Sequence, residues 1–272
     1  MIELNPIQFS TATPLFRRTR YGVLAAGTLE GGHPGRVFVD NLANPAIGLI
    51  CTRVGYYFVA GDAAQDAGCL SCLFEEELGP AQLALTGDPQ ILLFYDSPAW
   101  QAVLFDEFQR WQPRQIYKKR MVLGSSATEA LRSRMLHPPK HLHLTPVTQD
   151  LLECYPDRLG EILLFWDSIE NFIEQGLGVW VMDGETIASY CETVFTGAGE
   201  AEISIGTAMG YRRKGLARLT GTAFLQACLA RRWNPVWGCW PDNEPSVALA
   251  RSFGFVDDCD QPICFFELTE QE

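Results

Sequence analysis

The stretch Tyr211-Arg212-Arg213-Lys214-Gly215-Leu216-Ala217 decides the fold of the C-terminal half of this chain. It lies between an apolar run that predicts a strand, about 202–207, and an apolar-faced run that predicts a helix, about 216–231. A strand that turns through a basic, glycine-containing loop into a helix directs backbone N–H groups and the positive helix dipole at one point. Gly215 lets the backbone approach a ligand there because it has no Cβ. The stretch therefore predicts a pyrophosphate site.

A second pattern follows downstream. The run 235–240 is apolar and predicts a buried strand, and the stretch Asn243-Glu244-Pro245-Ser246-Val247-Ala248-Leu249-Ala250-Arg251-Ser252-Phe253 predicts a short helix. Asn243 can cap this helix, and Pro245 fits its first turn. Gly254 supplies the end, after which Phe255 begins another strand.

The spacing Arg-x-x-Gly-x-Ala differs from a P-loop and from the three-glycine dinucleotide fingerprint. It resembles the acetyl-CoA pyrophosphate loop of the GNAT superfamily of N-acyltransferases. The second pattern resembles the other signature of that family, Asn-x-x-Ser/Ala-x-x-Leu-Tyr-x-x-x-Gly-Phe, at the distance that the family shows. The runs 199–205 and 237–243 are similar, more narrowly, to a bacterial subgroup that includes zwittermicin-resistance acetyltransferases with an added N-terminal domain. The resemblance covers about residues 140–272.

The resemblance also implies where acetyl-CoA binds. Its pyrophosphate would contact backbone N–H groups of the loop, and its pantetheine arm would pair with the strand before the loop, where the sheet splays. The cofactor-binding residues implied in this way are Ser204, Ile205, Gly206, Thr207, Arg212, Arg213, Lys214, Gly215, Leu216, Ala217, Asn243 and Ser246.

The segment upstream predicts the rest of this fold. Residues 151–175 are mostly helical in pattern, with an interruption near Pro156. Residues 178–182 and 186–195 predict strands joined by an Asp-Gly turn. The order strand, helix, three-stranded meander, helix, strand, helix, strand is that of the GNAT core. We therefore expect an α+β protein in which residues 140–272 form a GNAT acetyltransferase domain, a mixed and splayed central sheet flanked by helices.

Residues 1–139 predict a smaller α+β domain of their own, without a catalytic signature. Strands are expected at 36–39, 46–51, 56–60 and 91–95, and helices at 98–111 and 128–136. The domain is a candidate for a degenerate relative of the C-terminal fold, although the sequence has no visible internal repeat. The boundary is expected at His137-Pro138-Pro139-Lys140, since paired prolines favour extended linkers. Alternation with apolar residues suggests that the histidines there and at 141 and 143 lie at a strand edge rather than in a metal site.

The net charge of −12 is uneven, because residues 140–272 carry 9 Lys and Arg against 20 Asp and Glu. One basic spot in an acidic half suits an anionic cofactor and a cationic amine substrate, although ordinary solubility charge explains the balance equally well. The balance argues against sequence-independent nucleic-acid binding. No run predicts a signal peptide or a membrane span, so we expect a cytoplasmic protein.

The nine cysteines predict free buried thiols in a reducing compartment. The pair Cys69-x-x-Cys72 lacks further ligands for zinc, so it predicts a structural thiol pair, and no metal is expected.

Acetyl transfer to an amine needs a base, a donor for the carbonyl oxyanion and a proton for the departing thiolate. Glu202 stands where many GNAT members carry a base, and Glu192 in the preceding strand is the second candidate; both could instead bind the ammonium groups of the substrate. Many relatives place a tyrosine proton donor where this chain has Ala250. The substitutes left open are Tyr190, Tyr211, Cys239 and solvent.

These residues predict an acetyl-CoA-dependent N-acetyltransferase that transfers an acetyl group directly to a primary amine of a small molecule, with a homodimer as a possible assembly. Two alternatives stay open. One is a GNAT-fold protein that binds CoA without catalysis and acts as a sensor or scaffold, which the missing tyrosine favours. The other is an N-acetyltransferase whose acceptor is a protein.

Overall fold

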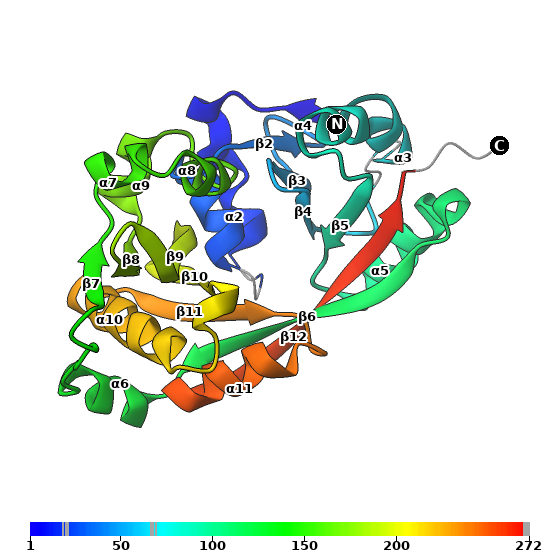
Figure 1. Cartoon of the computed structure of the whole chain (residues 1–272). Coiled ribbons are helices and arrows are strands. Elements are labelled where there is room, and N and C mark those ends of the chain that lie inside the picture. Colours follow the sequence, from blue (N-terminus) through cyan, green and yellow to red (C-terminus); the bar gives the residue numbers. More distant parts are fainter. Residues whose placement is uncertain (18, 20–21, 66–67, 69, 269–272) are drawn as a thin grey trace. The chain divides into compact units, whose positions relative to one another are not determined.

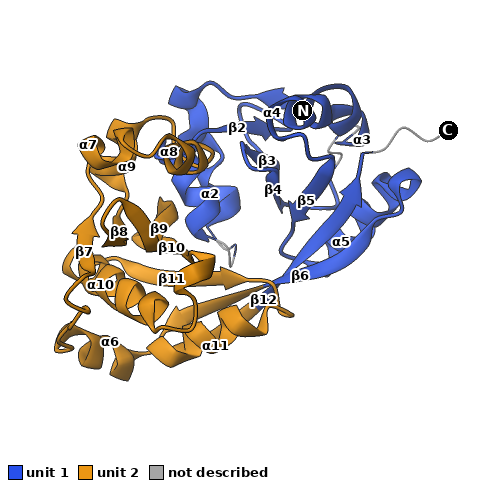
Figure 2. Cartoon of the chain, in the orientation of Figure 1, with its two compact units in different colours: residues 1–118, 260–272 blue, residues 119–259 orange. Residues whose placement is uncertain are grey.

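A computed structural model describes residues 1–17, 19, 22–65, 68 and 70–268 (Figure 1). The chain forms two compact units (Figure 2). Unit 1 comprises residues 1–118 and 260–272, and unit 2 comprises residues 119–259. The two limits lie inside strands β6 (Arg114–Leu123) and β12 (Phe255–Glu267), so each of these strands contributes to both units.

Unit 2 is built on a mixed sheet. Four strands form an antiparallel meander, a fifth strand runs parallel to the last of them, and part of β6 pairs antiparallel with the fifth. In spatial order the first five are β7 (His143–Pro146), β8 (Gly178–Asp183), β9 (Thr186–Gly197), β10 (Glu200–Thr207) and β11 (Asn234–Cys239).

Helices cover both faces of this sheet. Three short helices follow β7: α7 (Gln149–Glu153), α8 (Pro156–Leu163) and α9 (Ile169–Gln175). The others are α6 (Ser125–Arg132), α10 (Leu216–Ala230) and α11 (Glu244–Phe253), with a 3-10 turn at Met209–Tyr211. Val179 packs in a core with Phe224 of α10, whereas its neighbour Trp180 packs with Phe172 of α9. Because successive strand residues point to opposite faces, α10 and α7–α9 lie on opposite sides of the sheet.

Unit 1 repeats this order of pairing. An antiparallel series of four strands ends next to a parallel fifth strand, and residues 263–267 of β12 pair antiparallel with that fifth strand. The five are β1 (Ile2–Glu3), β2 (Gly35–Val39), β3 (Ile47–Thr52), β4 (Tyr56–Gly61) and β5 (Gln90–Phe94). Its helical elements are η1 (Pro6–Thr11), α1 (Thr13–Phe16), α2 (Gly22–Leu29), α3 (Leu70–Leu73), the π-turn η2 (Phe74–Leu78), α4 (Gly79–Thr86), α5 (Pro98–Glu107) and η3 (Gln109–Trp111).

In chain order the two series match element by element. Each runs strand, short helices, three strands, helix, strand, helix, strand: β1 to β6 first, then β7 to β12. The last strand of each series, however, pairs in the unit built from the other series. The expected boundary at 139/140 falls between the two series, whereas the contacts divide the chain at 118/119 and 259/260. The limits 1–139 and 140–272 therefore stay a prediction about chain order.

The predicted strands of both halves and the helices α10 and α11 are confirmed within a few residues. Other details differ. The helical segment 151–175 is broken near Pro156 as expected, but a second break at 164–168 separates α8 from α9. The helix expected at 128–136 runs instead from Ser125 to Arg132, and β6, α2 and α4 have no counterpart among the predicted elements.

The cysteines are partly as predicted. Cys51, Cys191, Cys228, Cys239 and Cys264 are free and buried. Cys154 and Cys259 are free but not buried, because they lie at the end of α7 and in β12 at positions open to solvent. Cys72 is disulfide-bonded, so the prediction of a free thiol is wrong there. Cys69 lies outside the described residues. No helix in the described part of the chain is long and apolar enough to cross a membrane.

Candidate functional site

The parallel strands β10 and β11 pair at their first residues and then separate. Their pairing covers Glu200–Glu202 against Asn234–Val236, and a bulge lies between Glu202 and Ile203. Beyond it, β10 continues to Thr207 and β11 to Cys239 without further pairing between them in the described ladder. The edge of β10 that faces β11 therefore presents backbone N–H and C=O groups to which an extended ligand can bind like an added strand.

The loop after β10 is held by its own side chains. The Nε of Arg212 donates to the carbonyl oxygen of Thr207 at 3.2 Å. The hydroxyl of Tyr211 donates to Asp183 at 2.9 Å, and this hydrogen bond raises the pKa of Tyr211. The ammonium of Lys214 lies 5.3 Å from the centre of the Tyr211 ring. These contacts fix the path of the loop but leave the backbone at its turn accessible.

The turn into α10 has the features of an anion site. Gly215 precedes the helix with a φ of 79°, and Arg213 has a φ of 63°. A Cβ built on Gly215 would meet no atom within 4 Å, so the space above it is open. The first N–H groups of a helix have no partner within the helix and carry its positive dipole. The buried side chain of Leu216 anchors the first turn, so these N–H groups are held in place. These features fit the pyrophosphate of acetyl-CoA.

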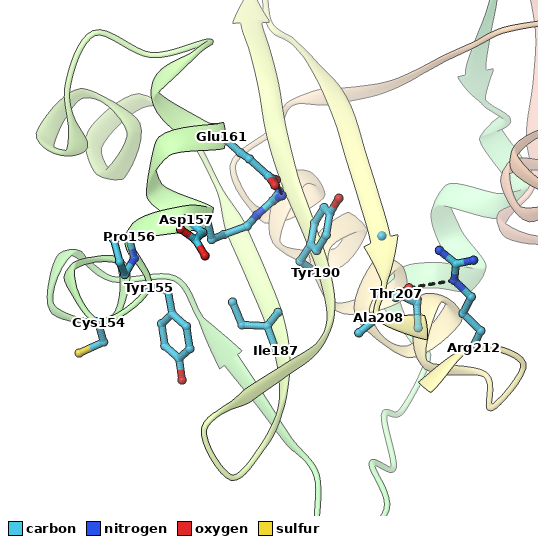
Figure 3. A pocket seen from close by; sticks show the side chains of 12 residues that line it. Cys154, Tyr155, Pro156, Asp157, Glu161, Ile187, Tyr190, Thr207, Ala208 and Arg212 are labelled. Carbon is cyan, nitrogen blue, oxygen red and sulfur yellow. Dashed lines mark hydrogen bonds and ion pairs between the residues drawn. The ribbon is translucent and has the colours of Figure 1, made fainter. Parts of the chain in front are cut away.

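A pocket of about 480 Å³ adjoins this end of β10 (Figure 3). One wall comes from the strand end and the loop, and the opposite wall comes from the loop before α8 and its first turns. The lining residues are Cys154, Tyr155, Pro156, Asp157, Arg158, Glu161, Ile187, Tyr190, Gly206, Thr207, Ala208 and Arg212. Of the residues implied for the cofactor, the pocket brings together Gly206, Thr207 and Arg212. Motif comparison missed the α8 wall, because no signature covers it.

Three of the residues that line this pocket are stacked on one another. A Cβ on Gly206 would lie 2.5 Å from Cζ of Tyr190 and 2.6 Å from its hydroxyl oxygen, so the phenol ring occupies the space that a side chain would need. Gly206 and Tyr190 face each other in the β10–β9 ladder. The guanidinium of Arg158 lies over the same ring, 3.5 Å from its centre. A side chain larger than glycine at position 206 is therefore incompatible with this stack.

Glu192 holds Arg158 in place. It accepts from both Nε, at 3.1 Å, and Nη2 of Arg158, and it also accepts from the indole N–H of Trp180. Arg158 pairs in addition with Glu161. Burial opposes the charge of Arg158, but the hydrogen bonds and charge of Glu192 outweigh this effect and raise the pKa of the guanidinium. Glu192 is only 2% exposed. Glu192 therefore fixes the guanidinium of Arg158 at the pocket wall, and its role as a base stays a prediction.

Glu202 is also buried, and it faces Phe195 across the ladder at the bulge. It does not belong to the lining of the pocket, so a proton from an acceptor amine would reach it through an intervening group. Its role as base stays a prediction.

Asn243 and Ser246 form hydrogen bonds at the start of α11. The side-chain oxygen of Asn243 accepts from the backbone N–H of Ser246 at 3.1 Å, which confirms the predicted cap. The hydroxyl of Ser246 accepts from the indole N–H of Trp237 at 3.0 Å. Their contact with a cofactor stays a prediction. Ala250, at the position of the missing tyrosine, is fully buried in the core between α10 and α11.

Comparisons with known proteins identify the family and the fold. The model of a family described as GNAT acetyltransferase matches residues 13–263. The expectation that the resemblance begins near residue 140 is therefore wrong. The motifs lie in the second half alone, but the family match also includes most of the first.

Individual proteins are similar over almost the whole chain. An uncharacterized N-acetyltransferase, YdfB, from Bacillus subtilis is 26% identical over 258 residues, which is 93% of this chain and 94% of that protein. A GCN5-related N-acetyltransferase-like protein from Streptococcus suis has a similar fold, with a TM-score of 0.70 at 18% identity, covering 96% of this chain and 98% of that one. A tandem GNAT protein from the clavulanic acid biosynthesis pathway reaches a TM-score of 0.65 at 11% identity, covering 100% and 99%.

Proposed function

Because the chain belongs to the family of GNAT acetyltransferases, we propose that it transfers the acetyl group of acetyl-CoA directly to a primary amine of a small molecule. The observation that carries this proposal is the pocket of about 480 Å³, which joins the end of β10 to the acidic turns of α8. Its volume falls in the range of roughly 300–1,000 Å³ that small-molecule sites occupy.

In this proposal acetyl-CoA lies along unit 2. The backbone N–H groups from Arg212 to Ala217 hold the pyrophosphate, and the exposed side chains of Arg213 and Lys214 add positive charge. The pantetheine arm pairs with the edge of β10 from Ser204 to Thr207, where β11 has diverged. A backbone N–H at the bulge would then polarise the thioester carbonyl, a contribution of about 3 kcal/mol for one donor.

The acceptor enters from the α8 side of the pocket. Asp157 lies in the first turn of α8, and Glu161 lies one turn further along. Both line the pocket with exposed side chains, and Glu161 also pairs with Arg158. An ammonium group is attracted by such carboxylates before its nitrogen is deprotonated. We assign that deprotonation to Glu202 acting through water, and we assign Glu192 to the positioning of Arg158.

The experiment that tests this function follows free thiol released from acetyl-CoA by the whole protein across a panel of small amines. We expect release that depends on the amine and an acetylated amine by mass spectrometry. The variant Glu202→Gln should lower kcat by at least about 100-fold, as expected for loss of a general base.

Two results would contradict the proposal. Binding of acetyl-CoA without amine-dependent release would favour a sensor or scaffold. Release with peptides but with none of the small amines would favour a protein acceptor.

A further inference from the structure

We infer that Tyr190 donates the proton that the departing thiolate of CoA takes up, in place of the tyrosine that relatives carry at position 250. This inference rests on the proposed function, because it needs acetyl-CoA to lie along β10. It concerns one step of the same reaction and one side chain of the pocket.

The position of the hydroxyl supports this role. The oxygen lies directly over Gly206, 2.6 Å from where a Cβ would stand. Gly206 belongs to the stretch of β10 that has separated from β11, so the phenol lies beside the path proposed for the pantetheine arm. The ring of Tyr190, from β9, leans toward the neighbouring strand β10 in the wall of the pocket (Figure 3). No other tyrosine in the described part of the chain combines a place in the pocket lining with a place over β10.

The other candidate donors are engaged elsewhere. The hydroxyl of Tyr211 donates to Asp183, away from the pocket lining. Cys239 is buried in the core on the α10 face, together with Trp237 and Phe253. Tyr155 lines the pocket, but its hydroxyl donates to the carbonyl oxygen of Glu185.

Arg158 packs against the ring of Tyr190. Its guanidinium lies 3.5 Å from the centre of the Tyr190 ring and is held by Glu192 and Glu161. A cation over the face of an aromatic ring is attracted to it, so Arg158 holds the phenol in its place over Gly206. The other charged groups around the phenol are Asp157 from α8 and Arg212 from the loop, both in the pocket lining. Arg158 is therefore a positioning residue for Tyr190.

Acetyl transfer with Tyr190 as the proton donor forms one bond and breaks another. The amine nitrogen forms a bond to the thioester carbon, and the carbon–sulfur bond breaks with its electron pair on sulfur. The phenolic proton of Tyr190 passes to that sulfur and gives free CoA thiol. The proton lost from the amine passes to Glu202 or water and returns to the phenolate through solvent.

The test compares the wild-type protein with Tyr190→Phe in the free-thiol assay between pH 6 and pH 10, over a range of about four pH units. We expect kcat of the variant to fall about 100-fold while the KM for acetyl-CoA stays within about threefold. The wild-type kcat should decline at the alkaline end, because the donor loses its proton there, and the variant should lack this decline. Tyr211→Phe should keep it.

Two further variants guard against a folding defect. Gly206→Ala places a methyl group against the phenol, so it should lower kcat in the same way, and the double variant Gly206→Ala/Tyr190→Phe should lose little more. Arg158→Met combined with Glu192→Gln leaves no buried charge alone and should lower kcat while the KM for acetyl-CoA stays within about threefold. A wild-type kcat in this double variant would show that Arg158 does not position Tyr190.

The results of these experiments distinguish a failure of the proposed function from a failure of the inference about Tyr190. A wild-type protein without amine-dependent release overturns both the function and this inference. An active wild type whose Tyr190→Phe variant keeps kcat and the alkaline decline overturns the inference alone. A decline that disappears in Tyr211→Phe assigns the donor to that residue and also overturns it.

Discussion

Gly215 adopts a backbone conformation that few other residues tolerate, at the point where the loop meets α10. Its φ is 79°, and no atom lies within 4 Å of where a Cβ would stand. A side chain there would therefore be strained but would not clash with the protein. Any large effect of such a side chain on the binding of acetyl-CoA must come from the ligand's approach.

We predict that Gly215→Val weakens acetyl-CoA binding by more than about tenfold, measured by titration calorimetry. The matched control is Gly199→Val in the turn between β9 and β10, where φ is 74° and the surroundings are equally empty. Both variants should lose about 1–3 kcal/mol of stability from backbone strain. Only the first should lose affinity, and equal affinity in the two would refute the placement of the pyrophosphate.

Buried thiols give the protein a second property that can be tested residue by residue. Burial raises the pKa of Cys228 and of Cys264 to about 12, from an ordinary value of 9.0. The pKa of each thiol is therefore higher in the folded protein than in the unfolded chain. Below pH 9 the free energy of unfolding is at its full value, and it falls as the pH rises toward 12, because the unfolded chain loses these protons first. The loss approaches roughly 4 kcal/mol per thiol at pH 12.

We therefore expect the free energy of unfolding to fall between pH 9 and pH 11 in denaturant titrations, and to fall less steeply in the double variant Cys228→Ala/Cys264→Ala. The variant will be less stable at neutral pH because of its small cavities, so the slope with pH is compared rather than the absolute value. Identical slopes in the two proteins would show that these thiols do not contribute.

At the scale of elements, the features that depend only on neighbouring residues could be predicted from the sequence. The loop into α10 and the cap, proline and glycine of α11 are each specified by neighbouring residues, and the structure confirms them. The stack of Arg158, Tyr190 and Gly206 was not predictable, because strand register brings Tyr190 and Gly206 together and only the packing of α8 adds Arg158. Strand β6 was missed for a similar reason: it carries Lys118, Lys119 and Arg120, which mask its strand pattern.

The cap of α11 allows structural and binding roles of Asn243 to be separated. Asn243→Ala removes the acceptor for the N–H of Ser246 and should lower the unfolding free energy by about 1 kcal/mol. Asn243→Asp keeps that acceptor and should be as stable as the wild type.

If the Asn243 amide also contacts the cofactor, as the family signature implies, both variants should bind acetyl-CoA more weakly by calorimetry. Normal affinity in Asn243→Asp would restrict the residue to capping.

At the scale of the whole molecule, the two series of elements share one order but differ where the ligand is proposed to bind. In unit 2 the strand β10 leads into the basic loop at 212–214. In unit 1 the corresponding strand, β4, leads into a segment that carries Asp62 and Asp66 and has no Lys or Arg before α3. The sequence does not reveal that the order of elements repeats. A strand needs only alternating apolar residues to keep its place in the sheet, and many different residues can satisfy that pattern.

In unit 1 a side chain of the protein occupies the place where the parallel strands β4 and β5 separate. The pairing of β4 with β5 ends at Phe58 and Phe94, while β4 continues to Gly61. The indole N–H of Trp100, a fully buried residue of α5, donates to the carbonyl oxygen of Gly61 at 3.0 Å. A protein side chain therefore uses the backbone group that an extended ligand would need.

We accordingly predict that each chain binds a single acetyl-CoA, in unit 2. Calorimetric titration of the full chain should give a stoichiometry of about one, because an anionic pyrophosphate is repelled by the acidic segment after β4 and the Gly61 carbonyl is already bonded to Trp100. Gly215→Val should weaken this binding by more than about tenfold, whereas Gly199→Val should retain it. A second equivalent bound by the wild type would mean that unit 1 holds a site of its own.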